Sequence, residues 1–298
     1  MIARVPRTTE QPVVVVGEFD GFHIGHRQLV HQAGVLAQRL RRPLVATILV
    51  AELPDGMLTT VEERCWALLA SGASQVQAMS VTTTGEADAG SSVADELIAR
   101  LDPACVVMAC LPFDAPSARH PSLRAGFARH AVEMVEMPRW NDPDGQYVTS
   151  ARIRDALRRG DIVAANDWMG RTFTLTGTVV HGSALGRTIG FATANLDLPP
   201  HRVVPMNGVY AGIVGLPNGA RHRAAINIGV RPTVETDGAV LVEAHLLDFD
   251  DDLYGATIDV SFTRWLRHEQ RFDSLDALVA QLALDVDRTR LLLRGSIE

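Results

Sequence analysis

Two hydrophobic patterns divide this chain, and the change from one to the other most constrains its fold. In the first half, short apolar runs such as Val13–Val16 alternate with segments whose apolar residues recur at helical spacing, as they do from His26 onward. This alternation predicts a parallel sheet covered by helices on both faces, in a Rossmann-like α/β domain. Beyond Gly170, short strands with turn residues replace the helical spacing, which predicts an antiparallel β-barrel. We therefore expect two domains, at residues 1–170 and 171–298.

Local signals place several further elements. Thr60 and Glu63 form a capping-box pattern ahead of an apolar helix. A single helix is expected from about residue 150 to residue 170. Asn218 and Gly219, between two apolar runs, predict a hairpin whose type I′ turn gives the asparagine a positive φ.

The chain is expected to end in a helix that packs on the barrel. Asp273 or Ser274 is the expected N-cap of this helix. Its apolar residues fall at helical spacing and form one stripe: Leu275, Leu278, Val279, Leu282 and Val286.

The composition limits the classes of protein to which the chain can belong. Its 298 residues are 47% hydrophobic and 21% charged, as in ordinary globular proteins, and the formal net charge is −7. This charge argues against nucleic acid as the main partner. The apolar runs are too short to span a bilayer, and the segment MIARVPRTTEQP lacks a signal-peptide core, so we expect a cytoplasmic protein without a membrane partner. The three cysteines form no CxxC pair and are expected to be free thiols: Cys65, Cys105 and Cys110.

The segment from Gly177 to Asn195, GTVVHGSALGRTIGFATAN, has the features of a phosphate and metal site. Glycines let backbone N–H groups approach a triphosphate closely, and the turn contains Gly182, Gly186 and Gly190. Thr193 and Asn195 offer the oxygen ligands that Mg²⁺ takes, and in an extended segment their side chains lie on one face. Glycines in a β-rich region are also ordinary turn residues, so this alternative stays open.

The C-terminal half resembles the riboflavin kinase domain of the bacterial bifunctional riboflavin kinase/FAD synthetase family. The resemblance continues in order through NGVYAGIVGL, RAAINIGVRPTV and LVEAHLLDFDDDLYGATIDVSFTRWLRHEQRF. The family's Pro-Thr-Ala-Asn motif appears as ATAN, with Ala192 at the proline position. The resemblance implies that Thr193 and Asn195 hold Mg²⁺, and that ATP is bound by Gly182, Gly186, Arg187 and Gly190.

The resemblance also assigns the general base to Glu243, which would deprotonate the terminal ribityl hydroxyl of riboflavin. In a strand, Glu243 and His245 project to one face while Val242 and Ala244 project to the other, so the carboxylate can face a site without entering the core. The alternative is a solvated strand residue. Four neighbouring aspartates lack the glycine and closing glutamate of a calcium loop and are interpreted as a solvated turn: Asp248, Asp250, Asp251 and Asp252. Three aromatic residues either stack on a flavin or fill the core: Tyr210, Phe249 and Trp265.

The N-terminal motif GEFDGFHIGH follows the first strand and precedes the first helix, where an open α/β sheet places its ligand. His23 and His26 flank Gly25 at the helix N-terminus, a position suited to phosphate. The motif resembles the His-x-Gly-His signature of nucleotidyltransferases, and specifically the FAD synthetase half of the same family, which transfers an adenylyl group to FMN. The resemblance implies nucleotide binding by Gly17, Phe19, Asp20, Gly21, His23, Gly25 and His26, with Arg152 and Arg154 reaching phosphate from a later helix.

Four places depart from that half of the family. Glu18 replaces an asparagine and puts a carboxylate close to the expected triphosphate. AELPDGM replaces a Pro-His-Pro segment, ACLPFDA replaces Gly-x-Asp-Phe, and TSA at residues 149–151 replaces Ser-Ser-Thr. We therefore expect a riboflavin kinase with an N-terminal adenylyltransferase-like domain whose own activity these departures put in doubt.

Two alternatives remain: the full bifunctional enzyme, which makes FAD, and a flavin-binding or scaffold protein that has lost catalysis in both halves. In the leading hypothesis the ligands are Mg²⁺, ATP, ADP, riboflavin and FMN. The sequence does not predict an oligomeric state.

Overall fold

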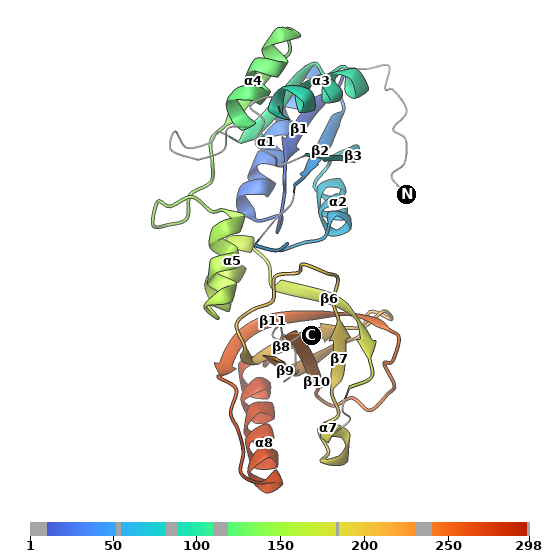
Figure 1. The fold of residues 1–298 in the computed structure, drawn as a ribbon, viewed down its shortest axis with the longest axis vertical. Coiled ribbons are helices and arrows are strands. Elements are labelled where there is room, and N and C mark those ends of the chain that lie inside the picture. Colours follow the sequence, from blue (N-terminus) through green and yellow to red (C-terminus); the bar gives the residue numbers. More distant parts are fainter. Residues whose placement is uncertain are drawn as a thin grey trace. The chain divides into compact units, whose positions relative to one another are not determined.

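The structure is a computed structural model that describes residues 11–51, 55–81, 89–109, 119–182, 185–230 and 240–296. Its contacts divide the chain into two compact units, Met1–Ser150 and Ala151–Glu298, drawn in Figure 1. Among the described residues, none of the helices has both the length and the apolar character needed to cross a membrane.

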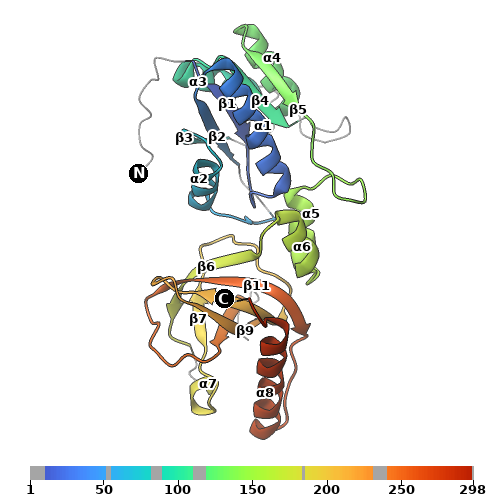
Figure 2. The ribbon, with the colours of Figure 1, turned by 180° about the vertical axis from the view of Figure 1, so that it is seen from behind.

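The N-terminal unit is built on a five-stranded parallel sheet in the order β3-β2-β1-β4-β5. Its strands are β1 (Val13–Gly17), β2 (Leu44–Val50), β3 (Gln75–Ser80), β4 (Cys105–Ala109) and β5 (Glu133–Met137). Its helices are α1 (Ile24–Leu40), α2 (Val61–Ala70), α3 (Ala89–Leu101) and α4 (Arg119–Arg129) (Figures 1 and 2).

Both faces of this sheet are buried, which confirms the predicted parallel sheet. Val13 and Val15 pack in one core cluster with residues of α1 and α2, whereas Val14 and Val16 pack in a second cluster with residues of α3 and α4. A strand buried on both sides needs apolar side chains at every position, which is why β1 reads as a continuous valine run. The strand order changes direction at β1, so the crevice beyond the carboxyl ends of β1 and β4 is the expected ligand position.

The capping box predicted for α2 is present. Thr60 Oγ1 accepts the Glu63 N–H at 3.2 Å, and the Glu63 carboxylate accepts the Thr60 N–H at 2.8 Å. Helix α4 was not predicted, because its sequence RHPSLRAGFAR has few apolar residues and a proline near its start. Burial raises the pKa of the free thiols of Cys65 and Cys105, and Cys110 lies outside the described residues.

The C-terminal unit contains a closed antiparallel barrel in the strand order β10-β7-β6-β11-β8-β9, which confirms the predicted barrel. Its strands are β6 (Phe173–Val180), β7 (Ala194–Asp197), β8 (Gly208–Gly215), β9 (Arg221–Val230), β10 (Val240–Leu246) and β11 (Thr257–Arg267). The short helix α7 (Leu185–Thr188) precedes β7, and the terminal helix α8 (Leu275–Leu292) packs against β8, β9 and β11. Ser274 caps α8, since its side chain accepts the Ala277 N–H.

Two local predictions were wrong. The helix expected from residue 150 to residue 170 is two helices, α5 (Ser150–Arg158) and α6 (Ile162–Met169), because Gly160 takes a φ of +75° and the Asp161 side chain caps α6. In the β8–β9 hairpin, Gly219 rather than Asn218 takes the positive φ, at 84°. The Gly219 N–H donates to the Leu216 carbonyl, and the Leu216 N–H donates to the Ala220 carbonyl, so the loop is longer than a two-residue type I′ turn.

The contact boundary lies before α5, whereas the sequence pattern changes near Gly170. Helix α6 is attached to the barrel because Asn166 bonds both the Phe262 carbonyl and the Phe173 N–H. The backbone N–H of Met206 also bonds the Leu157 carbonyl of α5. The division into domains at residue 170 stays a prediction.

Candidate active sites

A row of polar side chains crosses the outer face of the barrel. Glu243 of β10 pairs with Asn195 of β7 on one side and with Asn227 of β9 on the other. Val242, Ala244 and Leu246 alternate with them and are buried, so β10 has the predicted alternation. Register therefore gathers residues from three distant parts of the sequence at one place.

Two cavities lie beside these strands; Glu243 and Asn227 line the second of them, and Asn195 is in the lining of neither. The loop cavity, of about 490 Å³, lies between the α7–β7 segment and the loop after β10, and its lining includes Arg187, Gly190, Thr193, Phe249 and the aspartates Asp250–Asp252. The helix cavity, of about 280 Å³, lies between the barrel and α8. Its lining includes Glu243, Asn227, Arg267, Leu278, Leu282 and Val286.

Thr193 and His245 are the two described residues that line both cavities. They therefore form the junction between the two cavities. The loop cavity is the more polar of the two and has Arg187 and three aspartates in its lining, whereas the more apolar helix cavity has Glu243 and Arg267 in its lining. A group bound in one cavity meets a group bound in the other at this junction.

The residues at the row fit a hard cation. Asn195 is 5% exposed, and its Oδ1 is buried without a hydrogen-bond partner. An unsatisfied buried oxygen is costly, and Mg²⁺ takes oxygen ligands. Gly182 is needed for this arrangement, because a Cβ at that position would lie 2.4 Å from Asn195 Nδ2. Thr193 lies two residues before Asn195, immediately ahead of β7.

The other residues expected to bind ATP lie around the same two cavities. A Cβ on Gly186 would lie 2.3 Å from the Phe191 carbonyl oxygen, so the turn closes only with glycine there. Gly190 lines the loop cavity, as does Arg187, whose guanidinium lies 5.8 Å from the centre of the Tyr254 ring. The structure thus brings the expected kinase residues to one side of the barrel.

Helix α8 is held against the helix cavity by a buried ion pair. Arg267 Nη2 lies 2.7 Å from Asp285 Oδ2, and Arg267 Nε also donates to that carboxylate. Gln281 donates to the same carboxylate at 3.0 Å. The apolar stripe predicted for α8 is split: Leu278, Leu282 and Val286 line the cavity, whereas Leu275 is 54% exposed.

The three aromatic candidates have different environments. Tyr210 is fully buried, its hydroxyl donates to the Met206 carbonyl, and its ring lies edge-on to Phe262, so it belongs to the core. Phe249 lines the loop cavity. Trp265 lies outside the lining of either cavity.

In the aspartate run, Asp248 pairs with Arg290 at 2.7 Å, and the described residues contain no cluster of three or more His, Cys, Asp or Glu able to hold a metal.

In the N-terminal unit, the histidine motif lies at the expected edge of the sheet. His23 is the N-cap of α1 and stacks on His26, with ring centroids 3.7 Å apart. Both rings line a third cavity, the motif cavity, of about 180 Å³. The sequence did not single out Arg139 and Trp140, which also line it. They come from the polar connection after β5, and the only sequence signal was their place in that connection.

Both motif histidines are uncharged over the neutral pH range. Burial lowers the pKa of His23 to about 4, against a smaller opposing effect of Asp20. Burial also holds the pKa of His26 well below its ordinary value, with further lowering by His23, Arg64 and Arg139. The Nδ1 atoms of both rings are buried without a hydrogen-bond partner. Two neutral imidazoles, each with a buried Nδ1 that lacks a hydrogen-bond partner, thus line one cavity, an arrangement typical of a ligand site.

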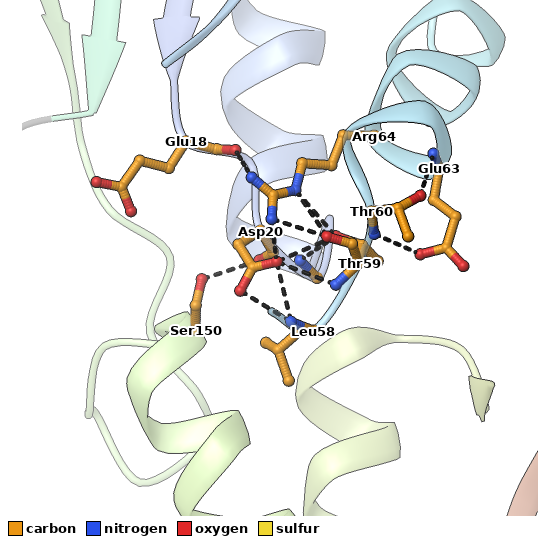
Figure 3. A network of polar contacts seen from close by, with 9 residues as sticks. Glu18, Asp20, Leu58, Thr59, Thr60, Glu63, Arg64 and Ser150 are labelled. Atoms are coloured by element: carbon orange, nitrogen blue, oxygen red, sulfur yellow. Dashed lines mark hydrogen bonds and ion pairs between the residues drawn. The ribbon is translucent and has the colours of Figure 1, made fainter. Parts of the chain in front are cut away.

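Other motif residues build the loop instead of lining the cavity. Figure 3 shows the Arg64 guanidinium between the Glu18 backbone oxygen, the Asp20 carboxylate and the Thr59 carbonyl, at 3.1, 2.7 and 2.7 Å. Asp20 also accepts the N–H groups of Leu58 and Thr59, and Ser150 Oγ donates to its carbonyl. The Glu18 side chain points away from this network in Figure 3.

The remaining motif residues pack in the core or shape the backbone of the loop. Phe19 is fully buried with a φ of 53°, and its ring fits above Gly17. Gly21 has a φ of +78° and donates its N–H to Thr59 Oγ1. In the C-terminal unit, Arg152 stacks over Trp168 at 4.2 Å and Arg154 is buried. Residues 52–54 of AELPDGM and residues 110–115 of ACLPFDA lie outside the described residues.

Two family models match the chain in its two halves. A riboflavin kinase model matches residues 169–293, and an FAD synthetase model matches residues 5–88. The chain therefore contains an FAD synthetase domain followed by a riboflavin kinase domain. The riboflavin kinase domain contains the barrel, the loop cavity and the helix cavity, and the FAD synthetase domain contains the histidine motif.

Curated relatives agree with this domain pair. A bifunctional riboflavin kinase/FMN adenylyltransferase of Pseudomonas fluorescens is 41% identical over 174 residues, which are 58% of this chain and 53% of the relative. One from Listeria monocytogenes is 28% identical and covers 96% of this chain and 95% of the relative. The chain thus spans about half the length of the Pseudomonas relative and nearly all of the Listeria relative.

A solved structure shares the fold of both domains. The crystal structure of a protein from Streptococcus pneumoniae, titled a macrolide-efflux protein, superposes with a TM-score of 0.79. The two chains are 28% identical, and the match covers 95% of each.

Proposed function

We propose that this protein is an ATP-dependent riboflavin kinase that transfers the γ-phosphate of ATP to riboflavin and releases FMN and ADP. The observation that carries the proposal is the junction at Thr193 and His245, where the loop cavity meets the helix cavity. Phosphoryl transfer needs two substrates aligned at one point and little covalent help from the protein. The family match supplies the identity of the substrates.

In this proposal ATP occupies the loop cavity. Arg187 and the glycine-containing turn face its phosphates, and Phe249 and Tyr254 are the aromatic residues in the lining of the cavity. Asn195 Oδ1 and the Thr193 hydroxyl are the proposed Mg²⁺ ligands, and bound Mg²⁺ would offset the negative charge of the phosphates. Binding of riboflavin and removal of the proton from its terminal hydroxyl are assigned to side chains of the protein.

Riboflavin occupies the helix cavity, with its ring against the apolar residues of α8 and its ribityl chain toward the junction. Glu243 lines this cavity and is placed by strand pairing on both sides, so it is the proposed base for the terminal hydroxyl. A positioned base contributes roughly 10²–10⁴ in rate.

Product analysis tests the proposal. The purified protein is incubated with Mg²⁺-ATP and either riboflavin or FMN, and flavins are separated by chromatography. FMN formed from riboflavin supports the kinase. Tight riboflavin binding without FMN would instead support a flavin-binding protein that has lost catalysis.

Adenylyl transfer from ATP to FMN in the N-terminal unit is a second candidate function. The motif cavity favours it, because two neutral imidazoles with unsatisfied nitrogens face it beside Arg139. FAD formed in the FMN incubation would support it. FMN alone in both incubations would leave a monofunctional kinase.

A further inference from the structure

We propose that His245 contacts the acceptor at the junction of the two cavities, where its Nε2 holds the polyol chain of riboflavin for phosphorylation. The inference rests on the kinase function proposed above and adds a substrate-contacting residue to it. The starting observation is that His245 lines both cavities, as Thr193 does, whereas Glu243 lines only the helix cavity.

The strand places the imidazole at this point. His245 follows Glu243 by two residues on β10, so both side chains project to the outer face of the barrel. The cross-strand partner of His245 on β9 is Ala225, whose methyl group leaves the helix cavity open beside the ring. The ring of Phe191 lies 5.4 Å from the imidazole on the α7–β7 side.

A backbone contact decides which nitrogen is available. His245 Nδ1 lies 2.8 Å from the Ala192 carbonyl oxygen. A carbonyl oxygen only accepts hydrogen bonds, so Nδ1 carries the hydrogen in this contact. In the neutral ring, Nε2 is then a hydrogen-bond acceptor. Ala192 therefore fixes both the orientation and the tautomer of the imidazole.

An acceptor nitrogen at this position suits a hydroxyl-bearing chain. The terminal ribityl hydroxyl gives its proton to Glu243, so His245 is left to bind a neighbouring hydroxyl of the same chain. This second contact holds the chain in one orientation while the terminal oxygen attacks phosphorus. Loss of one such hydrogen bond is expected to lower kcat/KM for riboflavin about tenfold.

Three substitutions separate this role from a structural one. His245→Ala removes both nitrogens. His245→Gln places a polar atom near Nε2, whereas His245→Asn places one near Nδ1 and preserves only the contact with Ala192. His268→Ala is the control, because His268 is exposed and lies outside the lining of both cavities.

Steady-state kinetics with riboflavin and Mg²⁺-ATP is the assay. We expect His245→Ala and His245→Asn to lose about tenfold in kcat/KM for riboflavin with KM for ATP within twofold, and His245→Gln to recover most of the loss. Full activity of His245→Ala, or recovery by Asn and not by Gln, would overturn the inference. A wild-type protein that forms no FMN would instead refute the kinase proposal itself.

Discussion

Replacement of Arg64 by methionine tests the buried network that shapes the histidine motif. Arg64 is 2% exposed and Asp20 is fully buried, so the substitution leaves a carboxylate in the interior without its cation. The hydrogen bonds from Leu58 and Thr59 to that carboxylate remain. Removal of one partner of a buried ion pair costs about 3–5 kcal/mol.

The expected change in melting temperature follows from the size of the unit. A unit of this length loses about 2–4 °C per kcal/mol, so the N-terminal transition should fall by roughly 6–20 °C. Calorimetry of the full chain measures the transition, and riboflavin phosphorylation reports on the barrel, which lies in the other unit. FAD formation, where present in the wild type, should be lost because the loop before His23 is no longer held.

Two variants control this experiment. Arg100→Met removes an exposed i,i+4 pair with Glu96 on α3, where the arginine side chain is 50% exposed, and should shift the transition by about 2 °C or less. The double variant Asp20→Asn/Arg64→Met buries no charge and should be more stable than Arg64→Met alone. A transition for Arg64→Met within 2 °C of the wild type would refute the reasoning, as would a double variant no more stable than the single one.

Three other predictions address the two sites. Glu243→Gln should keep ATP binding in titrations and lose roughly 10²–10⁴ in kcat for FMN formation, and a near-normal kcat would remove Glu243 from the role of base. Gly182→Ala should displace Asn195 and raise the Mg²⁺ concentration needed for half-maximal activity at least tenfold. Gly215→Ala is the control, because its Cβ would meet nothing closer than 3.7 Å, and it should leave that concentration unchanged. Equal responses of the two variants would contradict the metal assignment. Because the pKa of His23 is about 4 in the folded state and 6.5 in the unfolded chain, the unfolded state binds this proton first as pH falls. Protonation of His23 in the unfolded chain should therefore cost the N-terminal unit about 3 kcal/mol of stability between pH 6.5 and pH 4. Denaturant titrations should find a correspondingly smaller loss in His23→Asn, where the depressed pKa of His26 still contributes.

The sequence by itself determined the two architectures. Continuous valines in β1 require a strand buried on both faces, and the loss of helical spacing after residue 170 requires a different core, because each pattern can bury its apolar residues in only one way. Thr60 and Glu63 also fixed the start of α2, since a capping box acts within four residues.

Local patterns failed where two signals competed. Gly160 and Asp161 divided the helix expected after residue 150, because a left-handed glycine and a cap outweigh helical spacing on either side of them. In the β8–β9 hairpin, Pro217 precedes Asn218 and restricts the turn, so the positive φ falls on Gly219.

Tertiary structure alone decided how the candidate sites are assembled. Spacing grouped Thr193 with Asn195, and only the resemblance assigned Glu243 to the same site; the barrel register set Glu243 directly across from Asn195. The role of His245 depends on a contact with Ala192, 53 residues earlier, which no spacing rule contains. Hydrogen bonds and cavities join residues by distance in space, and a linear pattern records only distance along the chain.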